Sequence, residues 1–468
     1  MKQIFYIALA LIILSAPASG SDDIIINEGE LFSNPTTVID SETDKNQHIE
    51  DSNNQKQSLE AEQNRIHFGI SGEIQHVTNW SIKQKNHLEY QKRSDINPYI
   101  DGVMFIDVRL PDNIKAFANI EAVYNTDNSN AEADYEMKEL FVDFNINKAI
   151  YFRTGKQVLQ WGRCYLFNPT DLINVEKKTF TEKIGSREGT RGIKAHIPFG
   201  TDMNMYGFIN TTETDEYFKI DQFQKISGAY KIEFLVENTE MAFSIWGKED
   251  AHTVYGYDFS TKILGIDIQG ELSASYGDNT DKLVEQNGTL YAIKEEDKWI
   301  TKAAIDLGKA FDFNEQPDKI QVNLELFYNG AGYEENVFED NNIYMFDSPV
   351  AITSEFGINQ ASEINVPAGL KSLYLIGNGL YEPNYYSPYY AAIFTTVNKF
   401  FTSDFSLKAN LISNIKQDSF IFTTGIDYQN INDFNAGISI NRYFGATDSE
   451  YTFLKNAFDV IITFGLTF

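Results

Sequence analysis

Runs in which apolar and polar side chains alternate recur along most of the chain. In the first of them, Phe68, Ile70 and Ile74 alternate with Ser71 and Glu73. A period of two places apolar side chains on one face of a strand and polar side chains on the other. Comparable runs lie at residues 115–122, 139–146, 266–274, 320–326 and 405–411. The pattern predicts an all-β chain whose strands each have one apolar and one wet face.

The chain ends on a run of the same kind, with apolar residues at 460, 462, 464, 466 and 468. A soluble protein rarely leaves such an edge at its terminus, because an unpaired apolar edge invites aggregation. In an outer-membrane barrel the last strand pairs with the first, so no edge remains. We therefore expect a transmembrane antiparallel β-barrel, in which Phe464, Leu466 and Phe468 form the insertion signal.

The segments between the runs alternate in length, as expected when long outer loops alternate with short periplasmic turns. The long ones fall near 78–98, 125–135, 160–185, 211–224, 277–297, 330–387 and 443–456. Counting the runs between them gives about 18 strands, with a range of 16 to 20 because the 330–387 segment has room for a hairpin around Leu373 to Leu380. The alternative, a soluble β-sandwich, explains neither the terminal strand nor the loop asymmetry.

The N-terminal region predicts export. Lys2, the apolar stretch from Ile4 to Ile13 and the small residues that follow are the three parts of a secretory signal peptide, which we place at residues 1–20. Residues 21–64 contain eleven acidic residues, two lysines and few large apolar side chains. Such a segment buries too little to offset its ordering entropy, so it is expected to be a disordered acidic periplasmic tail. The barrel is then expected over residues 65–468.

Composition excludes several classes of function. The net charge of −29 argues against a nucleic-acid partner, which requires a basic surface. The single cysteine, Cys164, rules out an intrachain disulfide and a multi-cysteine metal site. The six histidines are scattered, and the sequence has no H-E-x-x-H motif, no G-x-S-x-G elbow and no glycine-rich phosphate loop. We expect neither an enzyme nor a protein with a metal or cofactor.

One segment carries a family resemblance. Residues 152–192 contain Phe-Arg-Thr-Gly-Lys-Gln, then Trp-Gly, then Asn-Pro-Thr-Asp, then Arg-Glu-Gly-Thr-Arg-Gly. This order resembles the R-x-G-[KR]-Q…WG…NP-x-D…R signature of alginate-export-type and related porin-like barrels. The resemblance covers roughly a tenth of the chain and implies a monomeric outer-membrane channel. It does not transfer a cargo, because the predicted inner faces carry nine acids against six bases.

The same segment has a physical interpretation. If Phe152 faces lipid, Arg153 faces the lumen, where a buried guanidinium needs a carboxylate partner such as Glu139 or Asp143. Gly155 is expected to give the outer loop room to fold inward, and the Asn-Pro and Asp residues favour turns in a loop that narrows the pore. Two roles stay open: contact with a solute, or anchoring of the loop. The lumen or constriction candidates are Arg153, Gln157, Glu139, Asp143, Trp161, Asn168, Asp171, Arg187 and Arg191.

These observations favour a porin-like channel in the outer membrane through which small hydrophilic solutes, such as saccharides or organic acids, diffuse passively. The expected partners are outer-membrane lipid, the barrel-assembly machinery, periplasmic chaperones and a small polar solute. The alternative is a surface-exposed binding or structural barrel whose lumen is filled by a loop.

Overall fold

The structure is a computed structural model of the whole chain. It describes residues 66–86, 89–126, 133–174, 179–181, 187–213, 225–287, 289–338, 345–346, 370–429, 433–446, 448–453 and 456–468. The expected signal peptide and acidic tail lie outside these residues.

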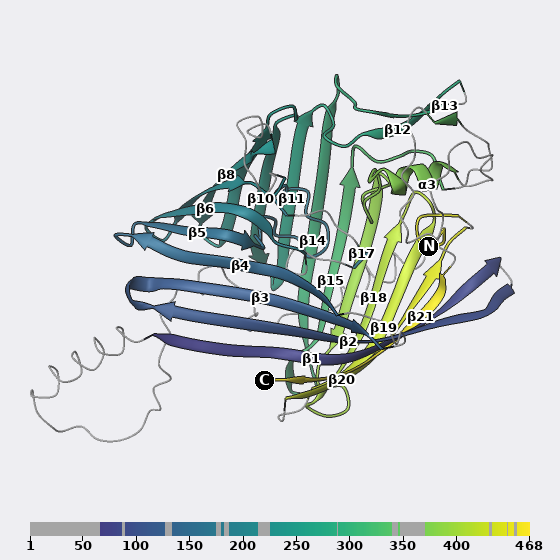
Figure 1. Cartoon of the computed structure of the whole chain (residues 1–468), viewed down its shortest axis with the longest axis horizontal. Helices are drawn as coiled ribbons and strands as arrows, with labels where there is room; N and C mark the ends of the chain where they lie inside the picture. Colours follow the sequence, from purple (N-terminus) through teal and green to yellow (C-terminus); the bar gives the residue numbers. More distant parts are fainter. Residues whose placement is uncertain are drawn as a thin grey trace, which may run out of the picture.

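Eighteen antiparallel strands form one closed sheet (Figure 1). Each strand pairs with the next along the chain, and the last pairs with the first, β1 with β21. The strands are β1 (His67–Asn86), β2 (Glu89–Leu110), β3 (Ile114–Asn125), β4 (Asp134–Ile146), β5 (Ile150–Gln157), β6 (Thr190–Phe199), β7 (Met203–Asn210), β8 (Ser227–Val236), β9 (Thr239–Lys248), β10 (Val254–Ile263), β11 (Ile266–Tyr276), β14 (Trp299–Phe313), β15 (Gln316–Asn329), β17 (Tyr389–Val397), β18 (Phe405–Asn414), β19 (Ser419–Gln429), β20 (Phe434–Phe444) and β21 (Asn456–Thr467). The predicted fold class and strand number are confirmed.

The apolar faces of the strands point outward. Ile70, Leu140 and Leu272 are large hydrophobic side chains, and all three are exposed. In a soluble barrel they would be in contact with water. Asp143, Asp258 and Glu325 point inward and are buried. A closed barrel with an apolar exterior satisfies the backbone hydrogen bonds internally, which is the requirement for a strand in hydrocarbon.

The connections at the two ends of the barrel differ, as predicted. One end has short turns, such as the single-turn 3₁₀ helix η2 (Pro111–Asn113) between β2 and β3. Between β4 and β5, Asn147 and Lys148 have φ values of 54° and 55°. Two consecutive residues with positive φ form a type I′ turn, whose twist matches that of the flanking strands. The long connections lie at the opposite end.

The structure corrects two expectations about the long connections. The segment near 78–98 is mostly strand, since β1 and β2 pair up to Asn86 and Glu89. Beyond the apolar belt both faces meet water, so pairing continues without the alternation that marks a membrane strand. Residues 370–377 form helix α3 (Leu370–Gly377) instead of a hairpin. Among the described residues, no helix is long and apolar enough to cross a membrane.

A small second sheet lies at the long-loop end. It consists of β12 (Lys282–Gln286), β13 (Thr289–Ile293) and the two-residue β16 (Met345–Phe346). Figure 1 shows β12, β13 and α3 together at one end of the barrel. Buried side chains from this region share one cluster of Leu283, Leu290, Val337, Phe338, Tyr374, Leu375 and Tyr386. The long connections therefore form a packed cap, which we call the outer cap.

The last residue closes the barrel. The Phe468 amide donates to the Gly72 carbonyl at 2.9 Å, and the Gly72 amide donates to the Phe468 carbonyl at 2.9 Å. The side chains of Phe464, Leu466 and Phe468 are exposed on the outer face. The terminal strand thus combines backbone closure with an apolar outer surface.

Deleting Phe468 should reduce the amount of folded barrel in the outer membrane several-fold, because it removes both closing hydrogen bonds and an outward aromatic ring. The measurement is the heat-modifiable band in outer-membrane fractions. Phe468→Leu, which keeps the backbone pair and an apolar side chain, is the matched control and should lose less. Equal levels of the deletion variant and the parent would contradict the role of the terminal strand.

Candidate functional site in the barrel lumen

The described parts of the connection between β5 and β6, residues 158–174, 179–181 and 187–189, contact inward residues of the wall, and we call them the lumen loop. Its first residues are fixed near β4: the Val158 amide donates to the Glu139 carboxylate at 2.9 Å. The Leu159 amide donates to the Asn174 side-chain oxygen at 3.0 Å, which ties the start of the loop to a later part of it. Because a backbone donor buried away from water needs a partner, these contacts set the path of the loop.

The structure places Arg153 against Asp143 rather than Glu139. The guanidinium makes a bidentate pair, with Nε 2.7 Å and Nη2 2.8 Å from the two carboxylate oxygens, and its Cζ lies 3.9 Å from the centre of the Phe141 ring. Both side chains are buried, at 7% and 5% exposure. Gln157 is also buried, and its amide nitrogen lies 3.4 Å from the carbonyls of Arg153 and Gly192. These residues brace the wall from which the lumen loop departs.

Gly155 has a different role from the one expected. Its φ is 129°, and a Cβ there would lie 2.1 Å from the Leu140 carbonyl oxygen on the neighbouring strand. The glycine therefore allows β4 and β5 to approach closely, whereas the lumen loop begins three residues later.

Two buried carboxylates on the far wall hold the middle of the lumen loop. Glu271 on β11 accepts hydrogen bonds from the backbone amides of Arg163, Cys164 and Thr170 at 2.6, 2.7 and 3.1 Å. Glu325 on β15 accepts from the amides of Leu166 and Phe167 at 2.8 and 2.7 Å. A carboxylate that accepts several backbone N–H groups forms the stronger, charge-assisted kind of hydrogen bond. The loop thus crosses the lumen and binds the opposite wall.

A single arginine adds an electrostatic anchor. The Arg163 guanidinium pairs with Asp258, Glu233 and Glu240, which lie on three successive strands. Lys231 lies 3.1 Å from Asp258, and its ammonium donates to the Trp161 carbonyl at 2.8 Å. Trp161 itself is buried against Leu159, Ile173 and Phe208.

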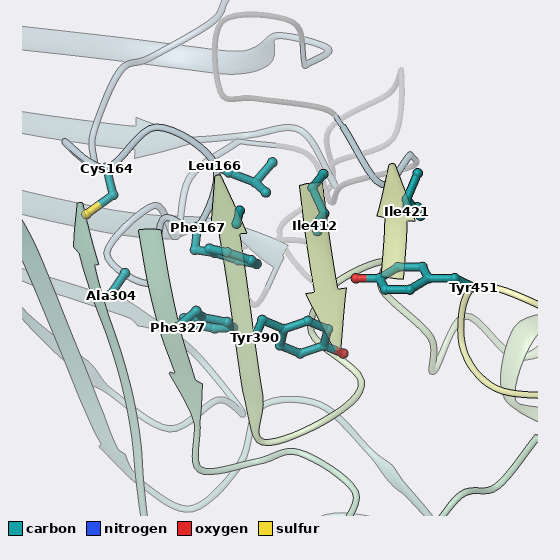
Figure 2. Packing of buried hydrophobic residues seen from close by; sticks show 10 residues of the cluster. Cys164, Leu166, Phe167, Ala304, Phe327, Tyr390, Ile412, Ile421 and Tyr451 are labelled. Carbon is teal, nitrogen blue, oxygen red and sulfur yellow. The ribbon is translucent and has the colours of Figure 1, made fainter. Parts of the chain in front are cut away.

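A cluster of buried aromatic and aliphatic side chains, which we call the aromatic cluster, packs the lumen loop against strands β14 to β19. Figure 2 shows Phe167 beside Phe327 and Tyr390, with Ile412, Ile421 and Tyr451 further along. The Phe167 and Phe327 rings are stacked, with centroids 4.9 Å apart. Burial raises the pKa of the Cys164 thiol in the same cluster, so the thiol stays neutral. A hydrophobic core therefore occupies part of the space inside the barrel.

The predicted turn and its partners are also in the loop. The Asp171 amide donates to the Asn168 carbonyl at 3.0 Å, which closes a four-residue turn. The Asp171 carboxylate accepts from the Arg187 guanidinium at 3.0 Å. The prediction that Arg191 faces the lumen is wrong. Arg191 is exposed and lies on the same face of β6 as Ile193, which points outward.

The outer cap is joined to the barrel wall by Glu450, which is fully buried in the connection between β20 and β21. Its carboxylate accepts from the Tyr390 hydroxyl at 2.8 Å and the Asn414 amide at 2.7 Å, both on strands. It also accepts from the Asn384 backbone at 3.0 Å and the Tyr381 hydroxyl at 3.3 Å, both in the cap. Burial raises the pKa of this carboxyl to about 7, although the hydrogen bonds from Tyr390 and Asn414 act in the opposite direction.

The lumen has a packed side and a wet side. The inward carboxylates of β10 and β15, Asp258 and Glu325, are fully buried beneath the lumen loop. Along β1 to β4 the described inward charges other than Asp143 are at least partly exposed: Lys138 pairs with Glu121 at 2.8 Å, and the two side chains are 25% and 24% exposed. Space for water therefore lies along this part of the wall.

A cavity of about 730 Å³ lies between the lumen loop and strands β6 to β14 at the outer end. Asp171, Asn174 and Arg187 of the loop line one side of it, and Trp246 and Lys302 of the wall line another. Among the described residues, no group of three or more His, Cys, Asp or Glu side chains is arranged to hold a metal ion.

Similarity to known proteins was found among solved structures. No protein-family model and no curated protein matches the chain. Solved structures similar to it include OccK9 (OpdG) of Pseudomonas aeruginosa, with 7% identity, a TM-score of 0.49, and coverage of 86% of this chain and 98% of that one. OccK5 (OpdH) of the same organism has 7% identity, a TM-score of 0.47 and the same two coverages. A mutant of the Rh. blastica porin has 8% identity and a TM-score of 0.38, and the match covers 86% of this chain and 100% of that one.

Sequence reasoning missed the residues that hold the lumen loop. The alternation in residues 266–274 and 320–326 places Glu271 and Glu325 on the polar faces of their strands, but nothing in the pattern connects them with amides more than a hundred residues earlier. Arg163 directly follows the Trp-Gly motif. The one signal for its three acidic partners is that each lies at a strand position whose side chain points inward.

Arg153→Ala should leave the Asp143 carboxylate buried and unpaired, a local loss of roughly 3–5 kcal/mol for a dry site. Amide exchange should increase over residues 139–157, and the melting temperature in detergent should fall. Combining it with Asp143→Ala should restore part of the loss, because the orphaned charge is gone. The same exchange and melting values in the single variant and the parent would mean that the pair is solvated.

Packing of the outer cap should depend on pH through Glu450. Its pKa is raised in the folded state, so its contribution to stability is fully present below about 4.5 and is lost as the pH rises through about 7. Amide exchange around residues 380–390 should increase on the order of a hundredfold over this interval, beyond its intrinsic pH dependence. Glu450→Gln should remove the effect. A pH-independent parent would contradict it.

Proposed function

We propose that this chain is a porin-like channel of the outer membrane through which small hydrophilic solutes diffuse passively. The observation that carries the proposal is the wet side of the lumen, where inward charges such as Lys138 and Glu121 stay partly exposed inside a closed barrel. The resemblance of residues 152–192 to alginate-export-type barrels supports the same class. Solute transport here needs only a gradient, a polar wall and a constriction.

The charge of the wet side favours small cations or neutral solutes over polyanions. The partly exposed inward side chains of β1 to β4 include more acids than bases; the acids are Glu73, Asp101, Asp107, Glu121, Glu136 and Glu139, and the bases are Arg109, Lys115 and Lys138. Because a lumen concentrates ions opposite in sign to its wall, such a surface attracts cations.

Planar-bilayer recording tests the proposal. The full chain should give discrete open-channel currents, and the reversal potential in a salt gradient should show weak cation preference that decreases at high salt as charges are screened. Glu121→Gln should reduce the preference, and Glu237→Gln, on an exposed turn, should not. Absence of current in a correctly folded barrel would reject the channel, and strong anion selectivity would reject the assignment of the wet side.

A second candidate, a binding or structural barrel with a filled lumen, is favoured by the aromatic cluster and the outer cap. The two candidates differ in what happens when the lumen loop is released. Glu325→Gln keeps the shape of the side chain but replaces an acceptor of two backbone amides with a mixed donor and acceptor, so the middle of the loop should detach. For a channel, conductance should rise from an existing level; for a filled barrel, current should appear only in the variant.

A further inference from the structure

Two buried groups of opposite charge line the cavity of about 730 Å³, which we call the outer cavity, and each uses only part of its hydrogen-bonding capacity. Arg187 is 5% exposed; its Nη1 donates to Asp171, while Nε and Nη2 are buried and have no hydrogen-bond partner among the described residues. Asp278 is 3% exposed; its Oδ1 accepts from the Thr280 amide at 3.1 Å, while Oδ2 is buried and has no partner in the described part of the chain.

Unpartnered charged groups in a buried setting are destabilising unless something binds to them. Nε and Nη2 of an arginine form one edge of a planar fork that fits the two oxygens of a carboxylate. Among the described residues no basic side chain forms an ion pair with Asp278, although Lys282 lies near enough to interact with its charge. One group is therefore arranged to receive an anion, and the other to receive a cation.

Neighbouring side chains add further hydrogen-bond donors to the lining of the cavity. Lys302 lines the same cavity, with its ammonium 5.5 Å from the centre of the Tyr385 ring, and adds positive charge that Asp171 does not neutralise. The Trp246 indole nitrogen, another donor, is buried in this lining, and so is the Thr190 hydroxyl; neither has a hydrogen-bond partner among the described residues. The lining therefore holds unused donors in addition to those of Arg187.

The geometry points to a binding site in the outer cavity for a small zwitterion, whose carboxylate binds Arg187 and whose ammonium binds Asp278. This inference rests on the proposed function, because it names the class of solute that the channel admits. The cavity volume lies in the range typical of small-molecule sites. A zwitterion can bind the unused edge of Arg187 and the unused oxygen of Asp278 at once, whereas a simple anion or cation can bind only one of them.

Binding by the full chain, refolded in detergent, tests the site by calorimetry with three probes of matched length: γ-aminobutyrate, butyrate and butylammonium. The zwitterion should bind about ten- to a hundredfold more tightly than either singly charged probe, as expected for one additional charge-assisted hydrogen-bonded pair. Glycine and ε-aminocaproate extend the series and report the distance between the two charges. Equal affinities of the three matched probes would overturn the proposal, and so would absence of saturable binding, which would mean a cavity filled only by water.

Two variants separate the two ends. Asp278→Asn keeps the size of the side chain, and should lower the affinity for γ-aminobutyrate to that for butyrate without changing the latter. Arg187→Lys keeps a cation beside Asp171 but loses the fork, and should weaken γ-aminobutyrate and butyrate while leaving butylammonium unchanged. Asp250→Asn, on an exposed lining residue, is the control. An unchanged zwitterion preference in Asp278→Asn would overturn the assignment.

Conductance without solute distinguishes failure of the site from failure of the channel. A barrel that conducts but binds all three probes equally remains a channel and loses the zwitterion site. A barrel that binds γ-aminobutyrate selectively but carries no current retains the site and rejects the channel.

Discussion

Every other feature depends on the closure of the sheet between β1 and β21. In hydrocarbon an unpaired strand edge exposes a row of backbone donors and acceptors, each of which is unfavourable by several kcal/mol. The pair between Gly72 and Phe468 removes the end of that edge, and the register from Glu73 to Lys83 removes the rest. Once the wall is closed, its inner face can be polar without any contact with lipid, and only then does a lumen with charged side chains become stable.

Inside that wall, carboxylates act as the structural framework of an irregular segment. The described residues of the lumen loop belong to no helix or strand, so Glu271 and Glu325 take the place of a neighbouring strand as partners of their amides. The positive charges of Arg163 and Lys231 offset part of the negative charge of the inward carboxylates. The aromatic cluster around Phe167 excludes water from the middle of the loop. The same loop meets the wall of β1 to β4 at Glu139 and at the Lys138 carbonyl, and it frames the outer cavity. One segment therefore borders both the wet side of the lumen and the proposed binding site.

The membrane strands were predictable because each residue there faces either oil or water, as Ile70 and Glu73 do on β1. Outside the membrane this constraint is absent, and the predictions fail there. The extension of β1 and β2 beyond the apolar belt has no alternation, and α3 lies where a hairpin was expected. The Asn168 to Asp171 turn was predictable from local chemistry. Asp143, not Glu139, pairs with Arg153 because the two residues are direct cross-strand neighbours in the β4–β5 register. That register depends on the residues at which the turn between the two strands begins and ends, which the alternation of side chains does not fix.

The sequence separation of the loop contacts has a consequence for the order of folding. Amides at residues 163–170 bind carboxylates that are 101 to 159 residues later in the chain. Loop closure over such distances is entropically demanding, and it becomes favourable only after the intervening strands are in place. Attachment of the lumen loop to Glu325 must therefore wait until β15 has formed, although its contacts with Glu139 on β4 and Asp258 on β10 can form earlier. The interior is thus completed late in assembly. Barrel assembly and lumen packing are then separate kinetic steps, and a variant can complete the first without the second.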